Sequence, residues 1–471
     1  MHAHRATVRL SLAALLALAA CSDQSNPAAP EAAAPAQART ADGQPIPSRA
    51  QERPGTWVER TDAQLWAAIS ASGGSAAVGL KSPGAVRGVY RGRVLVGRSD
   101  WSNGRAAVVA QKGVTLMSAD DLLPSMEVRL SGPESLAALR RLPFVDYVEP
   151  TMVDDGMQDF ASVGGCGWGS AWTGDRQYTT SGDVYSQKLT AMGIPSAWTL
   201  SSGAGVTIGL TDTGISSGQG QFTSTFATGE STGRTLKLLK VSSQASVYDS
   251  CGHGTRMSGI IAAPRDGRSV GGIAYRSSFV SVRHGNGVAA VSSSDAKAGV
   301  RAAAQNGARI VVMAWESLNW YWQVSDEIEY WHYNSQLLFF GAAGTSGCWD
   351  GILDSNVVFP ADMPEVVAVT GVTYPSGGVP CGIHHGADVE LTAYLDVPST
   401  GQYTADVVGM GGSSNATAVV GSVAALVWSR NPTLTRDAVR QRLIRTASYY
   451  PNRHPEEGYG VIDAYRAVSG N

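Results

Sequence analysis

The chain has 471 residues, enough for about three units at roughly 150 residues per domain, or for one large α/β domain preceded by smaller pieces. Lysine and arginine total 36 and aspartate and glutamate 39, so the net charge of −3 gives no reason to expect nucleic acid or an anionic membrane surface as a partner. With 55 glycines and only 16% charged residues, the composition excludes a coiled coil or a disordered acidic chain.

An apolar run near the N-terminus predicts export. It extends from Leu10 to Ala20 behind a basic start, and eleven helical residues rise only about 16 Å, too short for a bilayer core of about 30 Å. Residues 1–21 are therefore typical of a signal peptide. The ending Leu-Ala-Ala-Cys21 resembles a bacterial lipobox, which makes Cys21 the predicted lipidation site, and Ser22 favours the outer membrane if the cell is Gram-negative. The alternative is an ordinary signal peptide with a coincidental cysteine.

Lipidation of Cys21 would explain the odd count of five cysteines. The other four would then lie in an oxidising compartment: Cys166, Cys251, Cys348 and Cys381. An even set fits two disulfides, and three pairings remain open.

Residues 22–56 are predicted to be a disordered tether, because they contain six prolines and many alanines but no aromatic residue. A small α+β domain is expected within 57–153. Its predicted helices are Arg105–Lys112 and Pro133–Arg141, and its predicted strands are Val94–Val96, Val114–Met117, Met126–Leu130 and Phe144–Val148. Residues 154–190, partly rich in glycine and serine, are expected to be an extension of the part that follows.

Residues 191–471 predict a mostly parallel sheet covered by helices. The expected strands are short and apolar throughout: Val206–Leu210, Phe279–Val282, Ile310–Met313, Leu337–Phe340 and Val366–Thr370. Continuous apolar strands are typical of sheets buried on both faces. The stretch Asp295–Asn306 suits a crossover helix, and there is no internal repeat.

Asp212 follows a predicted buried strand, a place where α/β sheets put functional residues. A buried carboxylate there could orient a histidine. The surrounding Asp-Thr-Gly also occurs in aspartic proteases, but that mechanism needs two such carboxylates sharing a proton. The chain has no second Asp-Thr-Gly or Asp-Ser-Gly, which disfavours an aspartic protease.

His253 stands between two glycines in Cys-Gly-His253-Gly-Thr, ahead of a helix predicted over Thr255–Ala263. Glycines on both sides leave the ring unobstructed on a cleft wall, whereas the alternative is a turn histidine without a role. The other histidines are worse placed, so we predict no metal site.

Ser414 lies in Gly-Gly-Ser413-Ser414-Asn-Ala-Thr, which opens a helix expected to run to about Ser429. That helix is apolar or small on every side and should be buried. A serine at such an N-terminus sits where unpaired N–H groups and the helix dipole can stabilise a developing oxyanion. The alternative is a plain N-cap or loop serine, which we prefer for Ser413.

Together these segments resemble the active-site motifs of the subtilisin-like serine proteases, the subtilase or peptidase S8 family. The order Asp212, His253, Ser414 is the family's, with spacings of 41 and 161 residues. The last block matches the family's Gly-Thr-Ser-x-Ala-Thr, with Ser413 in the threonine place. Further matches are Phe359-Pro360-Ala361 with Val366–Val369 and Gly458–Ala464, and the likeness covers about residues 191–468.

The resemblance implies a three-layer subtilisin-like α/β fold and a serine endopeptidase acting on polypeptides through an acyl-enzyme at Ser414. It also implies that residues 57–153 are an inhibitory propeptide with a small ferredoxin-like α+β fold, similar to the inhibitor I9 type. The zymogen would be cut between about Val153 and Gly165. No cofactor is required, and the sequence does not locate any structural Ca²⁺.

The sequence departs from the family at the oxyanion hole. The family uses an asparagine amide after a buried strand, and Thr345 occupies that place here. A hydroxyl is shorter and differently aimed, and loss of such a donor costs about 10²–10³ in kcat, a magnitude established on a subtilisin. We therefore expect a slow or specialised enzyme.

The resemblance places the substrate groove along two segments, Ala314, Trp315 and Glu316 on one side and Ala342, Ala343 and Gly344 on the other. Glu316 stands where the family has glycine, which predicts a narrower groove or a preference for a basic substrate side chain. Arg256 and Ala418 replace a family histidine and proline without removing a catalytic atom.

Two other functions share this sequence pattern. One is a catalytically idle, lipid-anchored module that keeps the fold and binds peptides. The other is an esterase with the same triad, but Ser414 does not stand in a Gly-x-Ser-x-Gly elbow. We expect an exported monomeric lipoprotein of the cell envelope that touches the membrane only through Cys21. Because Cys21 precedes the propeptide, self-cleavage would release the mature protease to the periplasm or the extracellular space.

Overall fold

The computed structural model describes residues 56–81, 98–153, 166, 170–289, 291–346, 354–403 and 406–471. The chain forms two units, Met1–Gln51 and Glu52–Asn471, and every described residue belongs to the second. The predicted signal peptide, Cys21 and the tether up to Gly55 therefore lie outside the described residues.

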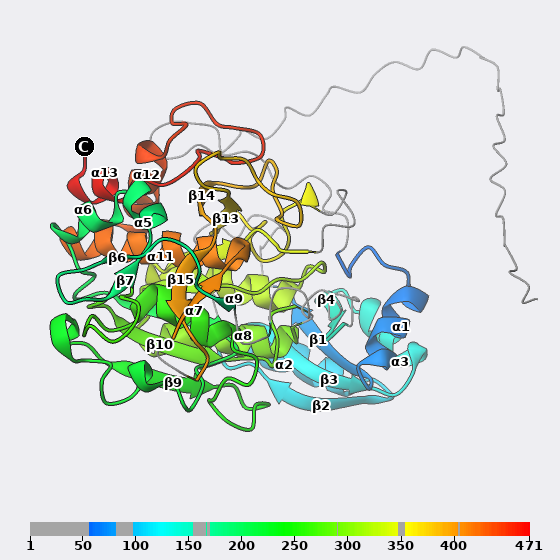
Figure 1. Ribbon diagram of the computed structural model, residues 1–471. Helices are drawn as coiled ribbons and strands as arrows, with labels where there is room; N and C mark the ends of the chain where they lie inside the picture. The colour runs from blue at the N-terminus through cyan, green and yellow to red at the C-terminus, as the bar shows by residue number, and fades with distance from the viewer. Residues whose placement is uncertain are drawn as a thin grey trace, which may run out of the picture. The chain divides into compact units, whose positions relative to one another are not determined.

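The first described part of the chain is a small α+β domain (Figure 1). Its elements are α1 (Asp62–Ala71), β1 (Ser75–Leu80), α2 (Arg98–Val109), β2 (Val114–Ala119), β3 (Ser125–Leu130), α3 (Pro133–Arg140) and β4 (Val145–Pro150). The strands form one antiparallel sheet in the order β2-β3-β1-β4. From β1 onward the elements follow the β-α-β-β-α-β order of ferredoxin-like domains.

The predicted elements of this domain agree with the structure except near its start. The strand expected at Val94–Val96 lies outside the described residues, and the helix expected from Arg105 begins earlier, at Arg98. Strand β1 was not predicted, because its residues are mostly small, although β1 pairs with both β3 and β4.

Helix α1 was not predicted either, although it does carry a sequence signal. Thr61 and Gln64 form a capping box, since Gln64 N–H donates to Thr61 Oγ1 at 3.3 Å and Thr61 N–H donates to Gln64 Oε1 at 3.0 Å. This reciprocal pair satisfies two backbone donors at the start of the helix.

The larger part of the described chain is built on a seven-stranded sheet in the order β14-β13-β12-β11-β8-β10-β9. Every neighbouring pair is parallel. The strands are β8 (Thr207–Asp212), β9 (Leu236–Lys240), β10 (Ser278–Arg283), β11 (Ile310–Met313), β12 (Leu338–Ala342), β13 (Val366–Val372) and β14 (Leu391–Tyr394). All five strands predicted here are present, which confirms the α/β class with a parallel sheet.

Helices cover both faces of this sheet, which explains its continuous apolar strands. Ile310 and Val312 of β11 pack in a core with α7 (His253–Ala262) and α11 (Gly412–Arg430). Val311 and Met313 pack in a second core with α8 (Ser293–Gln305) and α9 (Trp322–Ser335). Alternate residues of a strand face opposite sides, so each side needs apolar residues.

The other helices are α5 (Gln187–Ala191), α6 (Ile194–Trp198), α12 (Arg436–Thr446), α13 (Ala464–Ser469) and the short 3₁₀ turns Gly220–Phe222 and Gly229–Ser231.

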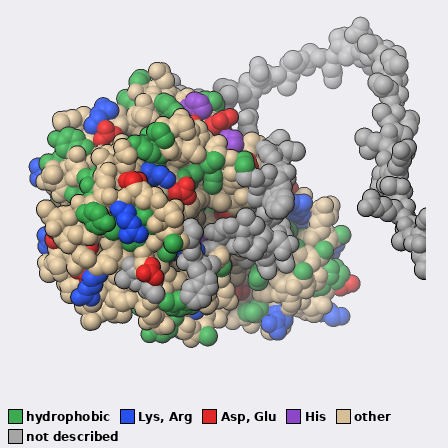
Figure 2. Space-filling model, in the orientation of Figure 1, with side chains coloured by type: hydrophobic (Ala, Val, Ile, Leu, Met, Phe, Trp, Pro, Cys, Tyr) green, Lys and Arg blue, Asp and Glu red, His purple; other side chains and the backbone are tan. Residues whose placement is uncertain are grey.

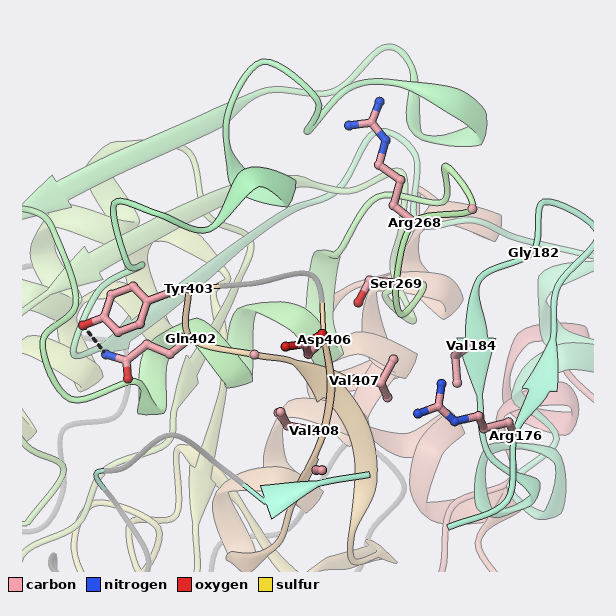
Figure 3. A pocket seen from close by; sticks show the side chains of 13 residues that line it. Arg176, Gly182, Val184, Arg268, Ser269, Gln402, Tyr403, Asp406, Val407 and Val408 are labelled. Carbon is pink, nitrogen blue, oxygen red and sulfur yellow. Dashed lines mark hydrogen bonds between the residues drawn. The ribbon is translucent and has the colours of Figure 1, made fainter. Parts of the chain in front are cut away.

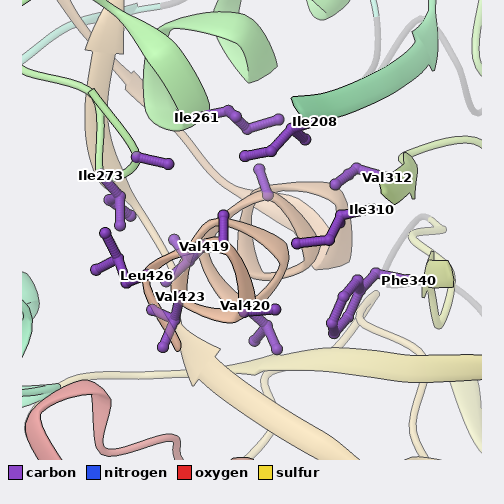
Figure 4. Close-up of a cluster of buried hydrophobic side chains, with 14 of the residues drawn as sticks. Ile208, Ile261, Ile273, Ile310, Val312, Phe340, Val419, Val420, Val423 and Leu426 are labelled. Atoms are coloured by element: carbon purple, nitrogen blue, oxygen red, sulfur yellow. The ribbon is translucent and has the colours of Figure 1, made fainter. Parts of the chain in front are cut away.

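Helix α11 forms the centre of the first core. Figure 4 shows Val419, Val420, Val423 and Leu426 of α11 surrounded by apolar side chains of the sheet and of the segment around α7. A Cβ added to Gly421 would lie 2.7 Å from Val312 Cγ2, so the helix sits closely on β11 at this glycine. The close packing fixes the middle of α11 against the sheet.

Smaller antiparallel sheets complete the described fold. One joins β15 (Val397–Thr400), β16 (Val407–Met410) and β5 (Ser170–Ala171), and another pairs β6 (Gln177–Tyr178) with β7 (Val184–Tyr185). On the face drawn in Figure 2, acidic and basic side chains are interspersed. Within the described ranges, no helix combines the length and the apolar character that a membrane span needs.

Candidate active site

Asp212 and His253 form a buried hydrogen-bonded pair. Asp212 ends β8 and His253 begins α7, and His253 Nδ1 lies 2.9 Å from both carboxylate oxygens of Asp212. The side chain of Asp212 is fully buried, and that of His253 is nearly so. Thr213 N–H also donates to Asp212 Oδ1 at 2.7 Å. A carboxylate bound to Nδ1 keeps a proton on that nitrogen and leaves Nε2 as the acceptor of the neutral ring.

Asp249, which was not predicted as a site residue, holds the start of α7. Its Oδ1 accepts from the N–H groups of Cys251 and Gly252, each at 2.8 Å, and its Oδ2 accepts from Thr255 N–H at 3.0 Å and Thr255 Oγ1 at 2.6 Å. Because the first N–H groups of a helix lack intrahelical partners, this carboxylate fixes the turn that carries His253. The sequence did contain a signal for this role, because an aspartate just ahead of a predicted helix is a typical helix-capping residue.

Ser414 lies at the N-terminus of α11, close to the end of β11. Its Oγ donates to the carbonyl of Ala314, the residue after β11, at 3.2 Å. In the described part of the chain, this hydroxyl bonds to Ala314 rather than to His253; catalytic hydrogen bonds often tighten only when substrate is bound. Strands β8 and β11 are parallel neighbours, and Ser414 bonds to the residue after β11, so Asp212, His253 and Ser414 lie at the same end of the sheet.

Thr345 and Ser413 connect the loop after β12 to the start of α11. Ser413 N–H donates to Thr345 Oγ1 at 3.1 Å, the two hydroxyls lie 3.1 Å apart, and Gly344 N–H donates to Ser413 Oγ at 3.1 Å. The N-cap of α11 is Gly411, so the N-cap interpretation of Ser413 is wrong. The hydroxyl of Ser413 instead bonds to a loop distant in sequence.

The groove candidates flank Ser414 on two sides, but one of them faces inward. Trp315 is 2% exposed, and its Nε1–H donates to Thr211 Oγ1 at 2.9 Å. Its ring also makes edge contacts with His284 and Phe359, so its side chain fills the interior beneath the sheet edge. The Trp315 side chain therefore does not line a groove, because the residue continues the inward alternation of β11, and a groove role for its backbone stays a prediction.

The remaining candidates lie where the two segments approach each other. Ala342 ends β12, and Ala343 and Gly344 continue into the loop. From the other side, Glu316 reaches across, and its Oε2 accepts from Thr345 N–H at 2.8 Å. This hydrogen bond joins the segment after β11 to the loop after β12 beside Ser414.

Two buried side chains near the pair carry shifted pKa values. Burial lowers the pKa of His284 to about 4 against the opposing effect of Asp212, so this ring is neutral at neutral pH. Its backbone N–H donates to the carbonyl of Asp212 at 3.0 Å. Burial also lowers the pKa of Arg256, whose Nε lies 3.2 Å from Met410 Sδ. Because His284 is neutral, it does not compete with His253 for the carboxylate of Asp212.

A disulfide fastens the N-terminal extension next to the candidate site. Cys166 is bonded to Cys251, two residues before His253, which settles one pairing that the sequence left open. Cys381 is also disulfide-bonded, whereas Cys348 lies outside the described residues.

A cavity of about 640 Å³ opens elsewhere in the described structure (Figure 3). Its walls come from the N-terminal extension, the loop after α7 and the β15–β16 hairpin, and they include Arg176, Arg268 and Asp406. None of the predicted site residues lines it. Among the residues that the structure describes, no cluster of three or more His, Cys, Asp or Glu side chains could hold a metal ion.

Comparison with known sequences points to one family. A model described as the subtilase family, peptidase S8, matches residues 203–461. The thermostable alkaline protease of Halalkalibacterium halodurans is 32% identical over 236 residues, covering 48% of this chain and 61% of that protein. Subtilisin DY of Bacillus licheniformis is 28% identical over 255 residues, covering 52% of this chain and 85% of that protein.

Solved structures show the same fold at low sequence identity. Fervidolysin from Fervidobacterium pennivorans has a TM-score of 0.63 and 17% identity, covering 84% of this chain and 61% of its own. The MycP3 protease of a type VII secretion system has a TM-score of 0.52 and 24% identity, covering 65% of this chain and 92% of its own. The chain thus spans about three fifths of fervidolysin and of the alkaline protease.

Proposed function

This chain belongs to the subtilase family of serine peptidases, and on that premise we propose that it is an exported serine endopeptidase made as a zymogen. The observation that carries the proposal is the buried pair of Asp212 and His253 at the same end of the sheet as Ser414. These are the residue types and the order of roles that acyl transfer to a serine requires.

The chemistry follows from the proton positions. Ser414 Oγ attacks the carbonyl carbon of the peptide bond while His253 Nε2 accepts the hydroxyl proton, and Asp212 stabilises the imidazolium that forms. The tetrahedral intermediate collapses when His253 gives that proton to the leaving amine. Water, activated by the same ring, then attacks the acyl-enzyme and releases the acid.

The oxyanion would be stabilised by two kinds of donor. Ser414 N–H is one of the first amides of α11, which a helix leaves without intrahelical acceptors. Thr345 supplies a hydroxyl whose position is fixed by Ser413. A fixed donor costs little reorganisation during the reaction, and this supports Thr345 as the replacement for an amide.

The small domain is proposed to be the inhibitory propeptide, because it caps two helices of the sheet domain. Glu149 at the end of β4 accepts from Trp322 N–H at 2.8 Å and Gln323 N–H at 3.0 Å, the first residues of α9. The carbonyl of Thr151 accepts from Ser293 N–H at 2.9 Å at the start of α8. A carboxyl group and a carbonyl at helix N-termini satisfy amides that would otherwise need water.

The predicted cleavage window, residues 153 to 165, lies almost wholly outside the described residues. Both of its flanks are nevertheless attached to the sheet domain: Thr151 bonds to Ser293, and Cys166 is bonded to Cys251 beside His253. Attachment of Cys166 two residues before His253 supports cleavage of this window by the chain's own Ser414. Cleavage there would separate the protease from an anchor at Cys21.

The test is a fluorophosphonate probe, which reacts with an activated serine. We expect the full-length chain to label and to be processed, whereas Ser414→Ala stays unlabelled, full-length and membrane-bound. Ser422→Ala is the matched control, since it removes another buried hydroxyl of α11, bonded only to the carbonyl of Ala418, and should still label. Absence of labelling in mature wild-type protein would favour the idle peptide-binding module instead.

A further inference from the structure

We infer that Glu316 selects substrates with a cationic side chain, arginine or lysine, on the residue whose carbonyl Ser414 attacks. This inference rests on the proposed function and names the substrate class of that site. It derives from the position of one buried carboxylate.

The side chain of Glu316 points to the face of the sheet that carries Ser414. Ala314 packs in the core that contains α11, whereas Trp315 packs in the opposite core with α8 and α9. Continuing this alternation by one residue returns Glu316 to the α11 side. Its contact with Thr345, which is itself bonded to Ser413, agrees with that direction.

Hydrogen bonds from both its backbone and its side chain hold Glu316 in place. Its backbone N–H donates to the carbonyl of Val288 at 2.9 Å, and its Oε2 accepts from Thr345 N–H at 2.8 Å. The residue is only 6% exposed. The carboxylate therefore crosses from the segment after β11 to the loop after β12 at a defined position.

The carboxylate and the nucleophile share their neighbours. Ser414 Oγ bonds to the carbonyl of Ala314, two residues before Glu316, and Ser413 bonds to Thr345, which Glu316 contacts. A substrate residue covalently attached to Ser414 thus has its side chain within reach of these two segments. Glu316 supplies the negative charge between them.

A fixed buried charge discriminates strongly between substrates. Coulombic interactions are several times stronger at low effective dielectric than in water, and a guanidinium or ammonium forms charge-assisted hydrogen bonds with a carboxylate. A neutral side chain of the same shape gains no such attraction, and a carboxylate is repelled. Specificity of this kind appears as a ratio of kcat/KM values between substrates.

The experiment compares peptides that differ only in charge at the attacked residue. Citrulline is a neutral isostere of arginine, so the ratio of kcat/KM for arginine over citrulline isolates the charge. We expect a ratio of at least about tenfold for the processed wild-type enzyme, which falls to within about twofold in Glu316→Gln. Glu316→Asp keeps the charge on a shorter side chain and should retain a preference for arginine.

Glu365→Gln is the matched control. Glu365 is also a buried carboxylate, but it precedes β13 and accepts from the Tyr333 hydroxyl at 2.8 Å. The arginine-to-citrulline ratio should not change in this variant.

Probe labelling separates the failure of this inference from failure of the proposed function. An enzyme that labels at Ser414 but shows an arginine-to-citrulline ratio below twofold refutes the role of Glu316 and leaves the peptidase intact. An unchanged ratio in Glu316→Gln refutes it as well. If the processed enzyme does not label with the probe, both the proposed function and the role of Glu316 are refuted.

Discussion

Asp120 links the small domain to α8, and its replacement gives a quantitative test of that interface. It lies in the turn between β2 and β3 and is 7% exposed. Its two oxygens receive Arg301 Nη1 and Nη2, each at 2.9 Å, and Oδ2 lies 3.1 Å from Lys297 Nζ. Leu122 N–H donates to Oδ1 at 2.8 Å. Removing the charge would leave two cations of α8 without this partner.

The lowered pKa of Asp120 gives the size of its contribution to the folding free energy. Burial alone would raise this pKa, but Lys297 and Arg301 outweigh burial and lower it from 3.8 to about 2. At about 1.4 kcal/mol per pKa unit, the ionised carboxylate contributes about 2 kcal/mol to folding at pH 7. A lowered pKa means that the contribution is present above about pH 4 and is lost as the pH falls through about 2.

Asp120→Asn should therefore reduce the free energy of unfolding by about 2 kcal/mol at pH 7 and by about half as much at pH 3. The assay is urea unfolding of the full-length chain, with Ser414→Ala present in every variant to prevent self-cleavage. Tryptophan fluorescence follows unfolding of both parts, because three of the twelve tryptophans, Trp57, Trp66 and Trp101, lie in the small domain.

Asp62→Asn is the matched control, because Asp62 pairs with Arg140 but its side chain is 51% exposed. Exposed ion pairs contribute about 0 to 1 kcal/mol. If Asp120→Asn costs no more than Asp62→Asn, or costs the same at pH 7 and pH 3, the ion cluster does not hold the small domain.

Two further substitutions test the site and the core. Thr345→Asn restores a longer amide donor and should raise kcat at least twofold; a smaller gain in steady-state turnover would show that Thr345 is not a compromised oxyanion donor. Gly421→Ala places a Cβ 2.7 Å from Val312 Cγ2 and should lower stability by about 1–3 kcal/mol in thermal unfolding. In Gly287→Ala the added Cβ meets no atom within 4 Å, so an equal loss in that variant would disprove the packing explanation.

Local sequence was sufficient wherever a short segment carries the whole signal. The strands of the parallel sheet are predictable because both faces are covered, so every residue of β11 is apolar. The predicted Asp212, His253 and Ser414 lie at strand and helix ends, as α/β topology requires. The capping box of α1 is equally local. The start of α1 was therefore predictable from Thr61 and Gln64.

The tertiary structure decided every feature that depends on partners distant in sequence. The hydroxyl of Ser413 bonds to Gly344, Glu316 crosses to Thr345, and Trp315 turns inward to Thr211.

By itself, then, the sequence determined the parallel sheet, the family and the residue types at the site. Folding decided which side chains meet there, and how the small domain attaches through Asp120 to Arg301. The physical reason is that periodicity and motifs record the environment of a segment, whereas a hydrogen bond between two loops depends on how the whole sheet aligns their ends.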